Sequence, residues 1–367
     1  MPNTAPDLAN ILRDRISKEG PISVAAFMAT ALSHPQQGYY VTRDPLGRSG
    51  DFITAPEVSQ MFGELIGLWA ATVWQFQDCP QNIRLIELGP GRGTLMADAL
   101  RAIDQAMPDL SRALCVDLVE ISPILRERQK ESLLSWHQKI DINWHDTIDT
   151  IPGAPCIIIA NEFFDALPVH QYERLSEGWC ERLVGLDEGG GFCFEHSGIL
   201  ADDSVIPEHF QYEPVGQFFE SNPSSIDIVG KLCDRMAGQK SACLIIDYGH
   251  IKQGVGETMQ AIKGQIFHDV LCDPGEADLT AHVDFEALST EAKNKGCRVY
   301  GPVLQKEFLE GLGIQARAEK LMAGATPDQA KDVQRALDRL IGEQEMGTLF
   351  KVVSFSDLNV AALPGFE

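Results

Sequence analysis

The sequence predicts an α/β fold whose centre is a largely parallel β-sheet. Short apolar runs suited to buried strands alternate with helical patterns between residues 83 and 162. Such alternation is typical of parallel sheets that helices cover on both faces. The same pattern resumes after residue 240 and ends with a strand pair. The expected strands of this sheet are 83–88, 114–121, 142–146, 155–162, 242–249, 297–304 and 349–355, and residues 259–267 are expected to form another strand.

The stretch 83–96, which reads IRLIELGPGRGTLM, joins the first strand to a helix through three glycines. Gly89, Gly91 and Gly93 stand two residues apart, and the helical pattern starts at Thr94. A strand that breaks at glycines into a helix N-terminus brings backbone N–H groups close to a ligand. Glu87 would lie at the carboxyl end of the strand, where open α/β sheets bind their ligands.

The spacing of the glycines selects among ligands. A dinucleotide loop of the form G-x-G-x-x-G requires a third glycine where this chain has Thr94 or Met96. The pattern E-x-G-x-G-x-G instead suits S-adenosylmethionine (SAM), which has no pyrophosphate but carries an amino group that an acid can hold. A tight turn that binds nothing is the alternative, since glycines are common turn residues.

Acids end the next two strands. Glu120 is placed to accept hydrogen bonds from ribose hydroxyls, which would serve NAD or SAM alike. Asp146 ends the third strand and either reaches the adenine amino group or is an ordinary turn aspartate. A cluster of polar residues stands at the end of the strand 155–162 and just after it. It comprises Asn161, Glu162 and Asp165.

These patterns divide the chain into four expected segments. Two short helices precede residue 35, and a loop rich in glycine and proline runs from 38 to 57 before the next helix. We expect the 38–64 stretch to close over the cofactor, with Tyr39 and Tyr40 at an acceptor tunnel or in the cap core. The other residues of this stretch that are candidates for the lid or the substrate site are Glu57, Gln60 and Glu64. The expected segments are a helical cap and lid (1–80), a SAM-binding half (81–168), an inserted β-rich and helical substrate-side subdomain (169–240) and the second half of the sheet (241–367).

Composition narrows the class of protein. A net charge of −23 argues against nucleic-acid binding, because basic patches supply that affinity. Nine scattered cysteines without C-x-x-C favour reduced thiols over disulfides or a zinc site, so no metal is expected. No apolar run is long enough to cross a membrane. Because Asp7, Asp14 and Glu19 disfavour a mitochondrial transit peptide, we expect a soluble cytoplasmic protein.

Four blocks of the sequence resemble the MidA-like family of SAM-dependent methyltransferases, which includes the mitochondrial assembly methyltransferase of respiratory complex I. The blocks are HPQQGYY with GDFITAPEVSQMFGE (34–64), ELGPGRGTLM (87–96), NEFFDALPV (161–169) and PGEADLTAHVDF (274–285). One position departs from the family, which usually has a histidine after the glycine at 264. This chain has Gln265 there, so a role that needs that histidine is not expected.

The resemblance implies a class I methyltransferase (Rossmann-like) fold with seven strands, mostly parallel, the last antiparallel. It also implies a protein substrate, arginine methylation and a link to complex I assembly, with Asn161 beside the cofactor. A monomer and a homodimer both stay open.

For an arginine acceptor, two carboxylates can orient the guanidinium fork and draw its charge away from the attacking nitrogen. Glu162 and Asp165 are the best-placed pair, although each could also cap a turn or be solvated. His282 either accepts the proton or orders its loop. A SAM-binding assembly chaperone without essential catalysis, a methyltransferase for another acceptor and an oxidoreductase are the alternatives.

Overall fold

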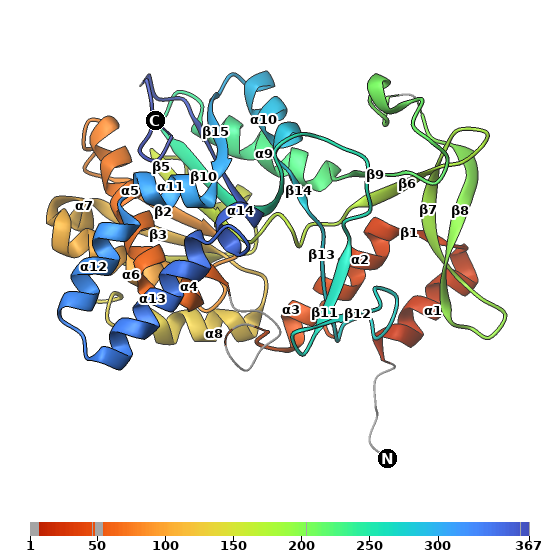
Figure 1. Cartoon of the computed structure of the whole chain (residues 1–367), viewed down its shortest axis with the longest axis horizontal. Helices are drawn as coiled ribbons and strands as arrows, with labels where there is room; N and C mark the ends of the chain where they lie inside the picture. Colours follow the sequence, from red (N-terminus) through yellow and green to blue (C-terminus); the bar gives the residue numbers. More distant parts are fainter. Residues whose placement is uncertain (1–6, 46, 48–53, 203, 360, 367) are drawn as a thin grey trace, which may run out of the picture.

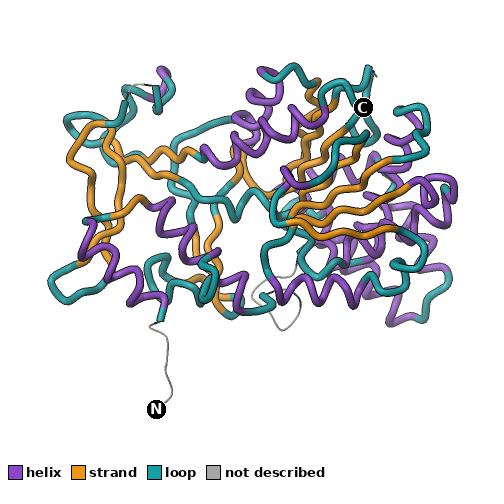
Figure 2. The backbone as a smooth tube through the Cα atoms, turned by 180° about the vertical axis from the view of Figure 1, so that it is seen from behind, coloured by secondary structure: helices purple, strands orange, loops and turns teal. Residues whose placement is uncertain are grey.

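The computed structural model describes residues 7–45, 47, 54–202, 204–359 and 361–366. Figures 1 and 2 show a large sheet covered by helices at one end of the molecule. At the other end, smaller antiparallel sheets pack with the N-terminal helices. Among the residues with coordinates, no helix has the length and apolar character needed to cross a membrane.

The large sheet has seven mostly parallel strands, as expected, in the order β15-β16-β10-β5-β2-β3-β4, and a short eighth strand, β14, pairs with the end of β10. β16 runs antiparallel to both of its neighbours, as the family resemblance implied. The strand order reverses at β2, which pairs with β3 on one side and β5 on the other. The strands are β2 (Ile83–Leu88), β3 (Leu114–Val119), β4 (Asp141–His145), β5 (Cys156–Asn161), β10 (Ala242–His250), β14 (Val283–Asp284), β15 (Arg298–Leu304) and β16 (Phe350–Ser356).

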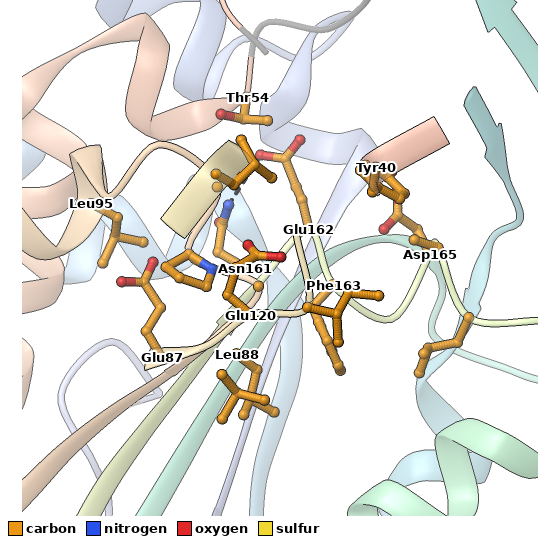
Figure 3. A pocket seen from close by; sticks show the side chains of 18 of the residues that line it. Tyr40, Thr54, Glu87, Leu88, Leu95, Glu120, Asn161, Glu162, Phe163 and Asp165 are labelled. Carbon is orange, nitrogen blue, oxygen red and sulfur yellow. Dashed lines mark hydrogen bonds between the residues drawn. The ribbon is translucent and has the colours of Figure 1, made fainter. Parts of the chain in front are cut away.

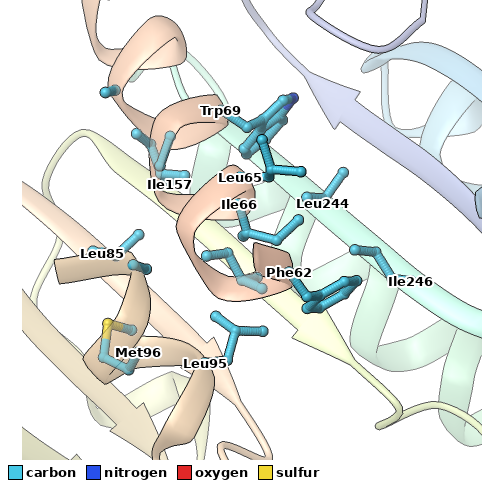
Figure 4. Close-up of a cluster of buried hydrophobic side chains, with 14 of the residues drawn as sticks. Phe62, Leu65, Ile66, Trp69, Leu85, Leu95, Met96, Ile157, Leu244 and Ile246 are labelled. Atoms are coloured by element: carbon cyan, nitrogen blue, oxygen red, sulfur yellow. The ribbon is translucent and has the colours of Figure 1, made fainter. Parts of the chain in front are cut away.

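Helices bury both faces of this sheet. In β5, Ile157 and Ile159 join the core formed with α5 and α6, while Ile158 and Ala160 join the core formed with α9 and α10. This two-sided burial explains why the strand reads as a continuous apolar run. Figure 4 shows Trp69 and other α5 side chains lying over the first face. The helices are α5 (Gln60–Phe76), α6 (Thr94–Ala106), α9 (Pro223–Met236) and α10 (Phe285–Asn294).

Further helices flank this core. Residues 305–325, for which the sequence analysis names no element, form two helices, and a third starts at Pro327. Ile314 and Ala318 of the second of these join the core beneath α5. These helices are α7 (Pro108–Ala113), α8 (Pro123–Ser132), α11 (Gln305–Gly311), α12 (Ile314–Ala323), α13 (Pro327–Ile341) and α14 (Met346–Leu349).

The other end of the molecule combines three segments of the chain. β1 of the N-terminal segment pairs with β7 of the insertion, and one apolar cluster joins Phe27, Val184 and Leu279 from the three segments. The N-terminal helices and the insertion therefore share one core. The elements are α1 (Leu8–Glu19), β1 (Ile22–Ser23), α2 (Val24–Ser33), β6 (His170–Arg174), β7 (Trp179–Leu186), β8 (Phe192–Leu200), β9 (Phe218–Ser221), β11 (Gln260–Lys263), β12 (Ile266–His268) and β13 (Asp278–Thr280).

Several boundaries differ from the sequence-based expectation. α5 and α9 were grouped with the cap and the insertion, but both pack on the large sheet. Within the insertion, β9 (Phe218–Ser221) pairs with β6 before α9 begins at Pro223. Residues 259–267 form a hairpin rather than one strand, since Gly264 and Gln265 have φ of 61° and 62° and make its turn.

We expect Trp69→Ala to destabilise the protein by about 3–5 kcal/mol, because the indole is 1% exposed at the contact between α5 and the sheet. Urea denaturation would measure the loss. Leu68→Ala on the same helix is the matched control, since that side chain is 38% exposed. Equal losses for both variants would contradict this packing.

Candidate active site

A cavity of about 420 Å³ opens at the carboxyl ends of β2, β3 and β5, where the strand order reverses (Figure 3). This is the position at which open α/β sheets bind ligands. Most of the residues predicted from the sequence line it: Tyr40, Glu57, Glu87, Gly89, Gly91, Thr94, Glu120, Asp146, Asn161, Glu162 and Asp165.

The glycine loop has a backbone that other residues rarely adopt. Gly89, Gly91 and Gly93 have φ of 61°, 54° and 77°. A Cβ on Gly89 would lie 2.9 Å from Cδ2 of Phe163, so a side chain there would collide with the next loop. Gly93 does not line the cavity but is the N-cap of α6. The glycines thus set the turn that brings the start of α6 to the cavity.

Glu87 at the tip of β2 is 3% exposed. Burial and, to a smaller extent, the nearby charge of Glu120 raise its pKa to about 8. Among the residues that the structure describes, none hydrogen-bonds Glu87 Oε2. A buried carboxylate oxygen without a partner is costly, and a cationic ligand in the cavity would relieve that cost.

Glu120, which follows β3, is held by a network that sequence reasoning missed. Its Oε1 accepts from the backbone N–H of Ser122 at 2.7 Å, and its Oε2 accepts from Gln129 Nε2 at 3.1 Å. Gln129 also donates to the carbonyl of Gly91 at 2.7 Å and accepts from Trp144 Nε1 at 2.8 Å. This buried amide therefore ties the acid to the glycine loop. From the sequence, Gln129 is only one position of an expected helix, and nothing near it indicates this role.

Two polar side chains lie at the tip of β5. Asn161 Nδ2 donates to Oε1 of Glu162 at 3.1 Å, and the same oxygen accepts from the backbone N–H of Ala55 at 2.9 Å. Burial raises the pKa of Glu162 to about 7. Within the described part of the chain, Asn161 Oδ1 is buried and has no partner. Figure 3 shows both side chains at the cavity.

Asp165 lies three residues further along the same loop and is 7% exposed. Burial raises its pKa to about 6. Tyr40 lies beside it in Figure 3 and donates its hydroxyl proton to Oδ1 of Asp278 at 2.9 Å. Asp278 also lines the cavity; it falls within the motif at 274–285, but sequence reasoning did not single it out.

Described residues of the predicted lid segment contact the glycine loop and the start of α6. Thr94 Oγ1 donates to Oε1 of Glu57 at 2.5 Å. Arg92 Nε donates to both carboxylate oxygens of Asp44 at 3.0 Å. Residues 46 and 48–53 of this segment lie outside the described residues. The helices at its ends are α3 (Tyr39–Thr42) and α4 (Ala55–Val58).

Besides Gly93, four predicted residues are not in the cavity lining. Glu64 is buried and pairs with Arg101 of α6 and Arg317 of α12, because its helical position turns it away from the strand tips. Gln60 is exposed on α5.

The other two pack elsewhere. Tyr39 is fully buried in the cap core, so it cannot line an acceptor tunnel. His282 packs edge-on against Tyr248, with ring centroids 5.5 Å apart, and burial lowers its pKa. Its backbone N–H donates to Thr258 Oγ1 at 2.9 Å, which favours the loop-ordering role over a catalytic one.

Asp146 lines the cavity, but its side chain is 80% exposed and accepts from Arg126 Nη2 at 2.6 Å. The predicted contact with an adenine amino group stays a prediction.

We expect Glu87→Gln to stabilise the cofactor-free protein increasingly as pH rises. The raised pKa means that the folded state keeps a proton that the unfolded state releases above its ordinary pKa of about 4.3. The wild type therefore loses stability as pH rises towards 8, by at most about 1.4 kcal/mol per pH unit, whereas the glutamine does not titrate. Urea denaturation at pH 5.5 and 8 would measure the difference. Glu131→Gln, at a side chain 70% exposed, is the control, and parallel slopes for all three proteins would contradict the inference.

The comparisons with known proteins agree with this geometry. Residues 65–303 match the model of a family described as S-adenosyl-L-methionine-dependent methyltransferases. The protein arginine methyltransferase NDUFAF7 of Danio rerio is 38% identical over 96% of this chain and 87% of its own length. The Homo sapiens protein of that name is 35% identical over 92% of this chain and 80% of its own length.

A solved structure is similar over nearly the whole chain. It is a COG1565 superfamily member from Burkholderia thailandensis bound to S-adenosyl-homocysteine. The TM-score is 0.86 and the sequence identity is 29%. The similarity covers 98% of this chain and 94% of that one.

The expected cytoplasmic location is wrong by these comparisons, because the relatives from fish, mouse and human are all named as mitochondrial. The acids used for that expectation belong to the folded cap. Asp7 caps α1 by accepting from the N–H of Asn10, and Asp14 and Glu19 lie within the helix. They therefore say nothing about targeting.

The residues present fit the cofactor. The unpartnered oxygens of Glu87 and Asn161 suit its amino group, Glu120 suits ribose hydroxyls, and the glycine loop leaves room for close approach. A sulfonium donor rather than a dinucleotide also agrees with the glycine spacing. The chain belongs to the S-adenosyl-L-methionine-dependent methyltransferase family, and S-adenosyl-L-methionine is its cofactor.

Proposed function

We propose that this enzyme is a protein-arginine N-methyltransferase that acts on a subunit of respiratory complex I during assembly. The observation that carries the proposal is the pair Glu162 and Asp165, two carboxylates on one loop that line the cofactor cavity. The names of the relatives, which are protein arginine methyltransferases, support the acceptor.

The two acids suit a guanidinium. Arginine stays protonated in proteins and presents a planar fork of N–H donors. Carboxylates can accept from this fork at two places and orient the nitrogen that attacks. Burial raises the pKa of Glu162 to about 7 and that of Asp165 to about 6, so a cation between them would offset the cost of ionising both.

The same acids can remove a proton. When bound, the cofactor supplies a methyl group on a positively charged sulfur. As the acceptor nitrogen forms its bond to carbon, it must lose a proton, and a carboxylate whose pKa lies near neutrality can take it and pass it to water. Tyr40 and Asp278 line the adjoining part of the cavity, where the rest of the acceptor side chain would lie.

The experiment is incubation of the protein with methyl-labelled SAM and individually purified complex I subunits, followed by mass spectrometry of the labelled residues. We expect label on arginine, and a reduction of about 100-fold or more in Glu162→Gln with SAM affinity kept. Glu181→Gln is the control, because Glu181 bonds His170 outside the cavity. SAM binding without any labelled arginine would remove the arginine assignment. Complex I assembly that is unharmed by Glu162→Gln would favour the chaperone alternative.

The methylation rate should rise with pH between about 5.5 and 7.5. Both acids must be ionised to hold the guanidinium, and their raised pKa values place that ionisation near pH 6–7. Initial rates at saturating SAM across this range would measure the dependence. A flat profile would contradict a role for these acids in the acceptor site.

A further inference from the structure

The loop that carries Glu162 and Asp165 rests on a third carboxylate, Asp247. Asp247 belongs to β10 and is fully buried, and it is not among the described residues that line the cavity. Its Oδ2 accepts from three successive backbone N–H groups, those of residues 163, 164 and 165, at 3.1, 2.9 and 3.3 Å. Its Oδ1 accepts from the backbone N–H of Tyr248 at 2.9 Å.

The backbone that Asp247 holds is strained. Glu162 has φ of 51°, in the left-handed region that residues with a side chain rarely adopt. Such a conformation persists only when surrounding contacts determine it. Here the N–H of Glu162 donates to the carbonyl of Ile246 at 2.9 Å, and the carbonyl of Asp165 accepts from Ala281 at 2.9 Å. The loop is thus tied at both ends, and Asp247 binds the residues between them.

Asp247 is a costly residue to keep at this place. Burial raises its pKa well above the usual range, and the charges of Asp165 and Glu162 raise it further. An apolar residue would avoid this cost but would leave the three loop N–H groups without an acceptor. These contacts therefore indicate that Asp247 keeps the 162–165 loop ordered.

We propose that Asp247 is a positioning residue of the methyltransferase, which holds the 162–165 loop in the strained turn that directs Glu162 and Asp165 into the cavity. The inference deepens the proposed function and rests on it for the role of the two acids. The holding of the loop itself is independent of which acceptor the enzyme uses.

Two substitutions of Asp247 separate the contributions of its oxygens. Asp247→Asn keeps one oxygen for the three loop N–H groups but places an amide N–H₂ against the N–H of Tyr248. Asp247→Ala removes every acceptor. We therefore expect Asp247→Asn to loosen the 162–165 loop in part and Asp247→Ala to loosen it fully.

The first measurement is hydrogen–deuterium exchange of the full-length protein with SAM bound. We expect the amides of residues 163–165 to exchange at least tenfold faster in Asp247→Asn, and faster still in Asp247→Ala, with little change at the glycine loop. This readout needs no acceptor, so it stands even if no arginine is labelled in the methylation assay.

The second measurement separates turnover from binding. We expect kcat with the labelled complex I subunit to fall about tenfold in Asp247→Asn and about 100-fold in Asp247→Ala, because a displacement near 1 Å of catalytic groups has effects of this size. The calorimetric Kd for SAM should stay within about threefold, since the carboxylate of Asp247 accepts from residues 163–165 and Tyr248 and not from the glycine loop.

The matched control is Asp117→Asn. Asp117 is also fully buried and pairs with Arg84 and His145, but it does not line the cavity. Its loss should lower thermal stability without changing kcat. Exchange at 163–165 that matches the wild type in both Asp247 variants would overturn the proposal. So would faster exchange with wild-type kcat, because the acids would then not need the loop to be held.

Discussion

The central strands of the large sheet are buried on both faces, and the placement of the acids and of Asn161 at the strand ends depends on this constraint. β2, β5 and β10 present mainly apolar residues to the helices on both faces, so a polar side chain in mid-strand is costly unless it finds buried partners, as Asp247 does. The carboxyl ends are the places where such groups can reach a ligand. Glu87 lies at the end of β2, and Asn161 lies at the end of β5. The reversal of strand order at β2 then opens space between them.

The cavity concentrates acids that the protein alone cannot fully neutralise. Glu87 and Glu120 face one another's charge at the cofactor end, and Glu162 and Asp165 do so at the other. Burial raises the pKa of each of these carboxyls. Such an arrangement favours cationic ligands at both ends, because each ligand restores the ionised form. A positively charged methyl donor and a guanidinium acceptor are cations of this kind.

Short motifs do not report which way a side chain faces, so the sequence could neither choose between the alternatives for Tyr39 and His282 nor separate Glu57 from Glu64. Tyr39 and Tyr40 are neighbours in one motif, yet Tyr39 is in the cap core and Tyr40 is at the cavity. Glu57 and Glu64 also share a motif, but α5 turns Glu64 towards Arg101 and Arg317. His282 stands in a third motif and contributes a backbone contact instead of an imidazole at the cavity.

By itself the sequence determined the sheet, the glycine loop, the cofactor and most of the acids that line the cavity. It could do so because buried strands, glycine turns and strand-end acids depend on residues close together in the chain. Only the tertiary structure decided the roles of Gln129, Asp247 and Asp278. Their partners come from other strands and loops, as when Asp247 binds N–H groups more than 80 positions away. Such pairings follow from how strands and loops meet in space, which local spacing does not encode.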